Sequence, residues 1–128
     1  MTLYLSFIYN NSINGGNVEN SIDKFYDYLT DKKCKDIAVY DLSKESQDCN
    51  IIFVVSISNA LSNKKFALQL MNELNIKEYP EGYNKGEWII FDLGDVIIHS
   101  FVTSVREKYN LDKLWKSKKV MINKQNKK

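Results

Sequence analysis

The sequence WIIFDLGDVIIHSF, residues 88–101, decides how this chain is expected to fold. Two apolar runs, 88–91 and 96–98, enclose the turn-forming segment 92–95, and this arrangement is typical of a β-hairpin. Gly94 supplies the positive φ that a tight turn of this kind requires. The stretch therefore predicts two strands joined by a short turn.

The side chains of this predicted hairpin divide between two faces. A two-residue loop pairs position 92 with 95, 90 with 97 and 88 with 99, whereas a one-residue bulge would reverse the faces. Both runs are apolar at consecutive positions, which predicts interior strands of an α/β domain with helices on both sides. With the two-residue loop, one face carries Trp88, Ile90, Ile97, His99 and Phe101.

Alternating elements are expected along the rest of the chain. Apolar residues at helical spacing predict a helix over 18–32 and a second one whose apolar face spans 66–74, with Ser58 or Ser62 as its N-cap and Asn75 near its end. Strands are predicted at 37–42 and 51–57, either parallel or joined as a wide hairpin. Pro80 limits 76–82 to a short edge strand or a turn, and a helix at 104–109 continues through 111–115. We expect one α/β domain with a mixed central sheet flanked by helices.

Composition supports a single soluble domain. The chain has 128 residues, 44% of them hydrophobic, and has no apolar run near the roughly 20 residues that a membrane span requires. Residues 1–17 form an N-terminal extension whose apolar part, 3–9, does not resemble a signal peptide. Cys34, Cys49 and a single histidine are too few for a zinc site or a disulfide framework, so we expect no metal and a reducing cytoplasm.

Charge is distributed unevenly along the chain. The net charge is +2, but six lysines and no acid lie from Lys116 onward, which leaves 12 basic against 16 acidic residues before it. An acidic body suits a partner that is itself basic. The tail, 117–128, is interpreted as a solvated disordered end, and the alternative is a contact with ribosomal RNA phosphates.

A longer pattern surrounds the hairpin and resembles the ribosome silencing factor (Iojap) family. It extends back to about Lys32 through Lys33, Asp36, Ile37, Asp41, Leu42 and Ser56, and so covers about two thirds of the chain. Its main part consists of Gly82, Gly86, Trp88, Asp92, Gly94, Asp95, Val96, His99, Phe101, Arg106, Tyr109, Leu111, Leu114 and Trp115.

This resemblance implies a specific function. Members of the family have α/β domains that resemble nucleotidyltransferases, yet they act by binding. They dock on ribosomal protein uL14 of the large subunit and block joining with the small subunit. The resemblance implies no cofactor and no catalysis. It makes Trp88, Asp92, Asp95, His99, Arg106 and Tyr109 the expected partner-binding residues.

Two segments depart from the family pattern. Asn50, Ile51 and Ile52 replace the usual Asp-Tyr-Phe, and 57–60 replaces Gly-Thr-Ser-Asn. Acidic residues that usually precede the matched arginine are absent from 103–105, so the affinity for the ribosome or the orientation on it is expected to differ.

Other functions stay open at this stage. Asp92 and Asp95 are paired carboxylates that would hold Mg²⁺ in a nucleotide-processing enzyme, although the chain lacks the phosphate-binding loop such chemistry needs. The interpretation we favour for them is a turn in which they accept backbone N–H bonds. An RNA-binding module built on the lysine tail is a third hypothesis. Apolar strands also permit a homodimer.

Overall fold

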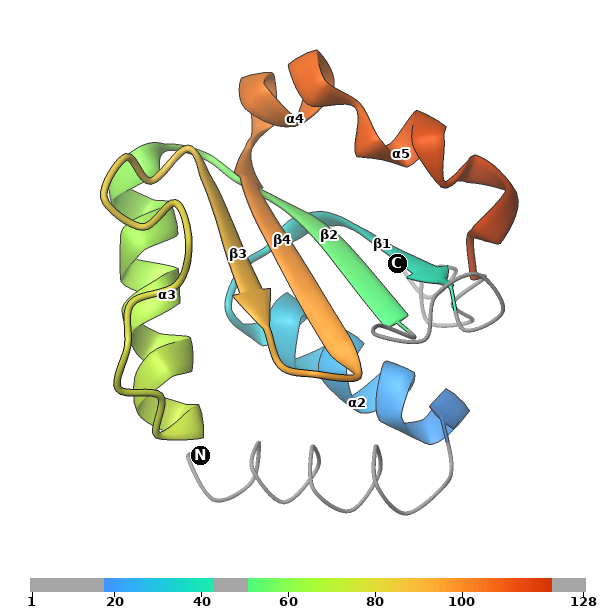
Figure 1. The fold of residues 1–128 in the computed structure, drawn as a ribbon, viewed down its shortest axis with the longest axis horizontal. Helices are drawn as coiled ribbons and strands as arrows, with labels where there is room; N and C mark the ends of the chain where they lie inside the picture. Colours follow the sequence, from blue (N-terminus) through green and yellow to red (C-terminus); the bar gives the residue numbers. More distant parts are fainter. Residues whose placement is uncertain (1–17, 43–50, 121–128) are drawn as a thin grey trace.

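A four-stranded sheet forms the centre of the computed structural model, which describes residues 18–42 and 51–120 (Figure 1). The expectations for the N-terminal extension, for Cys49 and Asn50, and for the tail beyond Val120 lie outside the described residues. Among the helices that are described, none has the length and apolar character needed to cross a bilayer.

The strands lie in the order β1-β2-β4-β3. Strands β1 (Lys35–Asp41) and β2 (Ile51–Ile57) are antiparallel, so of the two arrangements left open for this pair the wide hairpin is the one formed. Strand β4 (Val96–Val102) runs parallel to β2 and antiparallel to β3 (Trp88–Asp92). The predicted mixed sheet is confirmed.

Helices cover the sheet on both sides. On one side α2 (Val18–Asp31) and α3 (Ala60–Leu74) bury a large apolar core that includes Phe25, Phe53 and Leu70. On the other side the short helices α4 (Thr103–Tyr109) and α5 (Leu111–Leu114) pack over a smaller core centred on Val54 and Phe101. In Figure 1, α4 and α5 run above the sheet, and α2 and α3 lie below it and to its left. The prediction of one α/β domain is thus confirmed.

The hairpin forms, but its register is two residues away from the predicted one. Position 92 pairs with 97, 90 with 99 and 88 with 101, and the Leu93 N–H donates to the Val96 carbonyl at 2.8 Å. Gly94 and Asp95 are therefore the two loop residues, with Gly94 at φ 93°. The physical reason is that a positive φ is needed at the first loop position, where leucine is disfavoured and glycine is not. A shift of two residues leaves the predicted face unchanged.

Strand β3 lies at the edge of the sheet, so the prediction that both hairpin strands are interior is wrong for it. Consecutive apolar residues misled the prediction because side chains on both faces pack against apolar groups: Ile89 and Phe91 are buried in the core under α2 and α3, and Trp88 is half-buried against the smaller core on the α4 side. The edge itself is paired at one point. The Ile90 N–H donates to the Glu81 carbonyl at 3.0 Å, and this isolated bridge is the strand pairing made by segment 76–82. Pro80 removes one donor from that segment, in keeping with the absence of a longer ladder.

Buried polar side chains fasten α3 to the sheet. The prediction of Ser58 or Ser62 as the N-cap is wrong: Asn59 is the cap, and its Oδ1 accepts from the Ser62 N–H at 2.8 Å. Asn75 ends the helix as predicted. Inside it, Asn63 donates to the carbonyls of Gly86 and Ser100, at 2.9 Å each, and accepts from the Ser100 hydroxyl. These bonds fix the loop before β3 against β4.

The C-terminal helix expected over 104–115 is divided in two. Asn110 adopts a left-handed conformation at φ 51°, ends α4 and caps α5. A short 3-10 helix, η2 (Lys116–Lys118), follows, and the Val120 N–H donates to the Val39 carbonyl at 2.8 Å. The chain is thereby returned to β1, and α5 is held over the sheet from both ends.

Candidate functional site

Aromatic side chains from β3, β4, α4 and the end of α5 meet on the α4 side of the sheet. The Trp88 ring lies with its centroid 4.8 Å from that of Phe101 and 4.8 Å from that of Tyr109, and the His99 ring is 5.9 Å from that of Trp115. These separations are typical of favourable aromatic pairs. We term the rings of Trp88, His99, Phe101, Tyr109 and Trp115 the aromatic cluster. Three of its members, Trp88, His99 and Tyr109, are among the residues that the sequence predicted to bind a partner.

His99 is the buried polar member of this cluster. Its Nδ1 accepts a hydrogen bond from the Trp88 indole Nε1 at 3.0 Å, so the imidazole proton is on Nε2. Burial lowers the pKa of His99 to about 4, and the ring is therefore neutral at pH 7. The arrangement orients the Trp88 ring and leaves Nδ1 unable to act as a general base.

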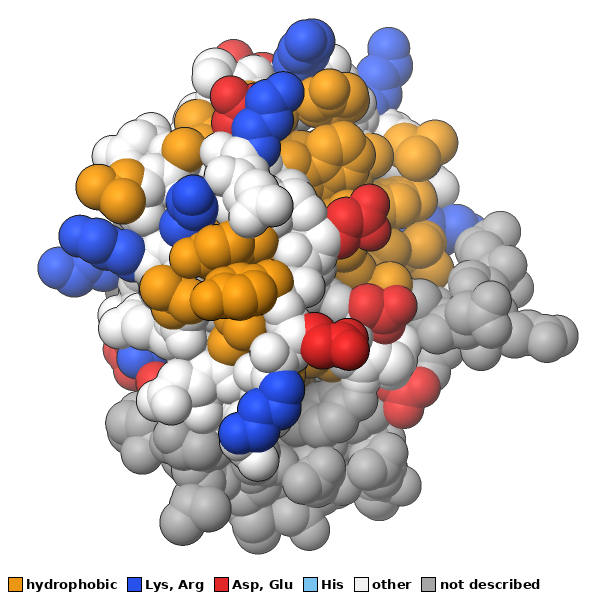
Figure 2. Space-filling view, turned by 60° about the vertical axis from the view of Figure 1, so that its left-hand side comes forward, with side chains coloured by type: hydrophobic (Ala, Val, Ile, Leu, Met, Phe, Trp, Pro, Cys, Tyr) orange, Lys and Arg blue, Asp and Glu red, His pale blue; other side chains and the backbone are white. Residues whose placement is uncertain are grey.

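Apolar groups remain exposed next to the cluster. Tyr109 is 51% exposed and Leu114 is 69% exposed, while Trp88, Ile90 and Ile97 are half-buried. We call these five residues the aromatic face. Figure 2 shows hydrophobic side chains gathered in the upper right of the view with acidic side chains beside them. Contiguous exposed apolar surface of this kind marks interaction sites in soluble proteins.

Carboxylates border this face at the outer side of β3. A small pocket of about 300 Å³ there is lined by Glu78, Glu81 and Asp92 together with Ile90 and Ile97 of the face. We call these three carboxylates the acidic rim. They give the edge of the aromatic face a negative charge.

The two turn aspartates differ in their surroundings. Asp92 is exposed, and its Oδ1 accepts from the Gly94 N–H at 3.0 Å, which is the turn role expected for it. Asp95 is half-buried, and its main-chain carbonyl accepts from the Ile51 N–H at 3.1 Å. Within 18–42 and 51–120, no group of three or more His, Cys, Asp or Glu side chains is placed to hold a metal ion.

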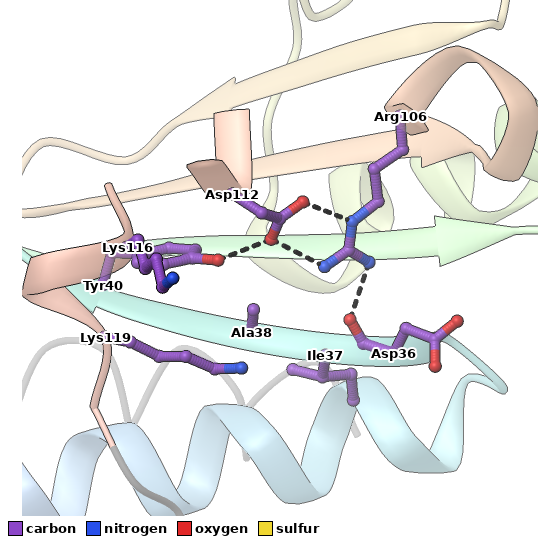
Figure 3. Close-up of a pocket in the computed structure, with 8 residues that line it drawn as sticks. All are labelled: Asp36, Ile37, Ala38, Tyr40, Arg106, Asp112, Lys116 and Lys119. Atoms are coloured by element: carbon purple, nitrogen blue, oxygen red, sulfur yellow. Dashed lines mark hydrogen bonds and ion pairs between the residues drawn. The ribbon is translucent and has the colours of Figure 1, made fainter. Parts of the chain in front are cut away.

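Arg106 is directed into the protein rather than toward solvent (Figure 3). Its guanidinium makes a bidentate pair with Asp112, in which Nε and Nη2 donate to the two carboxylate oxygens at 2.9 Å each. Its Nη1 donates to the Asp36 carbonyl at 2.6 Å and to the Ser56 hydroxyl at 2.9 Å. One side chain thus connects α4 to α5, β1 and β2.

Asp112 is the centre of this network. The Tyr40 hydroxyl also donates to Asp112, at 2.5 Å from Oδ1. Burial alone would raise the pKa of Asp112, but the hydrogen bonds from Arg106 and Tyr40 outweigh it and lower that pKa. Burial, and then the bond to Asp112, raise the pKa of Tyr40. Asp112 is therefore ionised and Tyr40 protonated at neutral pH, and the network fixes α5, which carries Leu114 of the aromatic face, against β1 and α4.

Comparison with known proteins gives this arrangement a family. The model of the family described as "Ribosomal silencing factor during starvation" (RsfS) matches residues 16–128. The chain belongs to the RsfS family. It is 32% identical over 98 residues to the ribosomal silencing factor RsfS of Chromobacterium violaceum, covering 71% of this chain and 78% of the relative. It is 29% identical over 90 residues to that of Bacillus subtilis, covering 66% and 75%.

Solved structures agree with this assignment. A crystal structure of a Chromobacterium violaceum protein superposes with a TM-score of 0.64 at 28% identity, covering 77% of this chain and 85% of that one. A Bacillus halodurans protein gives 0.61 at 26% identity, covering 76% and 92%. The RsfS family is a regulatory, ribosome-associated family, so membership implies that this protein acts at the ribosome.

Sequence reasoning missed several residues that build the candidate site. Asp112 and Tyr40 are 72 residues apart, and no spacing rule connects them. Leu114 belonged to the family pattern but was not expected to contact a partner, although it is the most exposed large apolar side chain described. Glu78 and Glu81 lie in the segment 76–82, which was predicted as a short edge strand or a turn and not as part of the site. The proximity of Pro80 was the only local signal that this segment lies along a sheet edge.

Proposed function

We propose that this RsfS protein binds the large ribosomal subunit through ribosomal protein uL14 and thereby prevents the small subunit from joining. The aromatic face is the proposed contact surface. The observation that carries the proposal is an apolar surface in which Tyr109 and Leu114 are exposed and Trp88 is half-buried, bordered by carboxylates, in a chain whose family acts on the ribosome.

The composition of this face suits a protein partner. Tryptophan and tyrosine supply much of the binding energy at protein interfaces, because a large rigid ring is buried at a small cost in conformational entropy. The acidic rim complements the basic surface of a ribosomal protein, and the chain before Lys116 is itself net acidic. Asp92 would take part as a rim residue and Asp95 as a turn residue.

His99 and Arg106 are proposed to act on the partner indirectly. The histidine orients Trp88, and the arginine holds α4 and α5 in place, so both shape the aromatic face from beneath. A face fixed in advance binds with less loss of entropy than one that must order itself. Silencing then needs only steric exclusion, without any bond being made or broken, and would take place in the cytoplasm, where ribosomes assemble.

Co-sedimentation with isolated ribosomal subunits tests this proposal. The purified protein is centrifuged with large and small subunits, and both its binding and the formation of joined ribosomes are measured. We expect binding to the large subunit alone and a loss of joining. Binding to neither subunit would overturn the proposal.

A matched pair of variants locates the surface. Leu114 and Leu61 are 69% and 64% exposed, and the first lies by the aromatic face while the second is on α3. Leu114→Ala combined with Tyr109→Ala should weaken binding to purified uL14 by at least tenfold, whereas Leu61→Ala should leave it unchanged. Equal effects of both changes would exclude the aromatic face as the contact.

A further inference from the structure

Lysines from three elements converge on a groove of about 700 Å³ on the opposite side of the sheet from the aromatic face. Lys32 and Lys33 come from the turn after α2, Lys35 from the start of β1 and Lys65 from the first half of α3. Ile57 and Phe66, both part of the core under α2 and α3, also line it. We call this surface the lysine groove.

The groove has an excess of positive charge. Among the residues that the structure describes, its lining contains four lysines and no Asp or Glu. Lys32 pairs with Glu73 at 3.1 Å and lies over the Tyr28 ring, so its charge is partly neutralised. Lys33, Lys35 and Lys65 are exposed and make no ion pair with any described residue. Three neighbouring ammonium groups without a counter-ion favour an anionic ligand.

The backbone that carries these lysines is fixed. Lys33 adopts a left-handed conformation at φ 68°, and its N–H donates to the Thr30 carbonyl at 3.0 Å. The Cys34 N–H donates to the Leu29 carbonyl at 3.1 Å, and the Cys34 side chain is buried. These bonds close the end of α2 and hold the start of β1 against it, so the lysines are presented from a rigid turn.

We propose that the lysine groove binds the phosphate backbone of RNA, which on a ribosome is ribosomal RNA. Lysine acts as a flexible point charge and recognises phosphate without requiring a fixed geometry. The aromatic ring in the lining, Phe66, is 3% exposed and offers no stacking surface to a base. At the start of α3, the Ser62 N–H already donates to the Asn59 side chain and is not free to bind a phosphate. The lysines are therefore the groups that would bind the phosphates. Charge-based contact with a strand, without base recognition, is therefore what this groove can provide.

This contact goes beyond the proposed function and does not depend on it. The aromatic face and the lysine groove lie on opposite sides of the sheet, so a protein and an RNA strand can be bound at once. The two are separable in experiment, since RNA binding is measured with RNA alone and face binding with uL14 alone.

Fluorescence anisotropy of a labelled RNA hairpin of arbitrary sequence tests the proposal. The full-length protein and the triple variant Lys33→Gln, Lys35→Gln, Lys65→Gln are titrated at several salt concentrations. We expect the variant to bind at least tenfold more weakly, and the slope of log affinity against log salt to fall by about 2, as for three lost phosphate contacts. Its affinity for uL14 should stay unchanged.

Two further triple variants control for net charge and for folding. Lys77, Lys85 and Lys113 are exposed and lie outside the groove, so changing these three to glutamine removes the same charge. This control should retain most of the RNA affinity. The triple variant Lys33→Arg, Lys35→Arg, Lys65→Arg keeps the positive charges and should also retain the RNA affinity. The proposal is overturned if the unmodified protein does not bind the RNA, or if the two glutamine triples lose affinity equally.

Discussion

Replacing Arg106 by methionine should destabilise the fold by about 3 kcal/mol. The arginine side chain is 12% exposed and makes four hydrogen bonds: two to Asp112, one to the Asp36 carbonyl and one to the Ser56 hydroxyl. Hydrogen bonds to charged groups contribute about 1.5–3 kcal/mol each, but bonds made by one group are not additive. Removing one partner of a buried pair costs about 3–5 kcal/mol. Asp112 is 30% exposed and regains some hydration, so the lower end of that range applies.

Chemical denaturation followed by tryptophan fluorescence measures this loss. A destabilisation of this size should also lower the Tm by about 10 °C in a domain of this length. Lys108→Met is the matched control, since Lys108 lies exposed on the same helix and should change stability by less than about 0.5 kcal/mol. A double-mutant cycle with Asp112→Asn should give a coupling energy of at least about 1 kcal/mol. A loss below about 1 kcal/mol for Arg106→Met, or no coupling, would refute the role assigned to this network.

Two further changes address the aromatic cluster and the loop before it. Burial lowers the pKa of His99 from 6.5 to about 4, so as the pH falls the unfolded state takes up the proton first. Stability should therefore be full above about pH 6.5 and decrease from there toward pH 4. His99→Gln should flatten this part of a pH series of denaturant titrations, and identical pH dependence in both proteins would contradict the assignment. Gly82 has φ 85°, and a Cβ there would lie 2.0 Å from the Trp88 carbonyl oxygen. Gly82→Ala should then cost well over about 1 kcal/mol in thermal unfolding and weaken uL14 binding by displacing Trp88, and an unchanged Tm would show that the loop adapts freely.

Regular elements could be predicted from the sequence because they depend on local periodicity. The strand at 51–57 has apolar residues at six of its seven positions, and the helix at 60–74 has a clear buried stripe, so both were placed nearly correctly. The set of residues that share one face of the hairpin was also predicted, since a register shift of two preserves side-chain direction. The position of the loop was not, because the prediction put Leu93 where the glycine has to be.

The polar network and the lysine groove could not be predicted in this way. Arg106 bonds to Asp112, six residues further along the chain. A continuous helix would place these two side chains on different faces. They come together because Asn110, in its left-handed conformation, changes the direction of the chain. Lys33 and Lys65 meet only because α2 and α3 pack on the same side of the sheet. Contacts of this sort depend on the packing of elements, and no sequence interval encodes them.

The residues of a family pattern in a binding protein therefore fall into two groups: those that can contact the partner at the surface, and those that hold the surface residues in place. Of the residues that the pattern singled out, Tyr109 is exposed and Trp88 is half-buried, whereas His99 and Arg106 make hydrogen bonds to other residues inside the protein. Changing an internal residue should alter stability and partner affinity together, while changing Leu114, which is 69% exposed, should alter affinity alone. Leu114→Ala should leave the Tm within about 2 °C of the parent, which is a change under about 0.5 kcal/mol, and should weaken partner binding. If Arg106→Met lowers both the Tm and the affinity, the aromatic face acts as a preformed surface that the polar network supports. The opposite pattern would mean that the partner contacts the polar network itself.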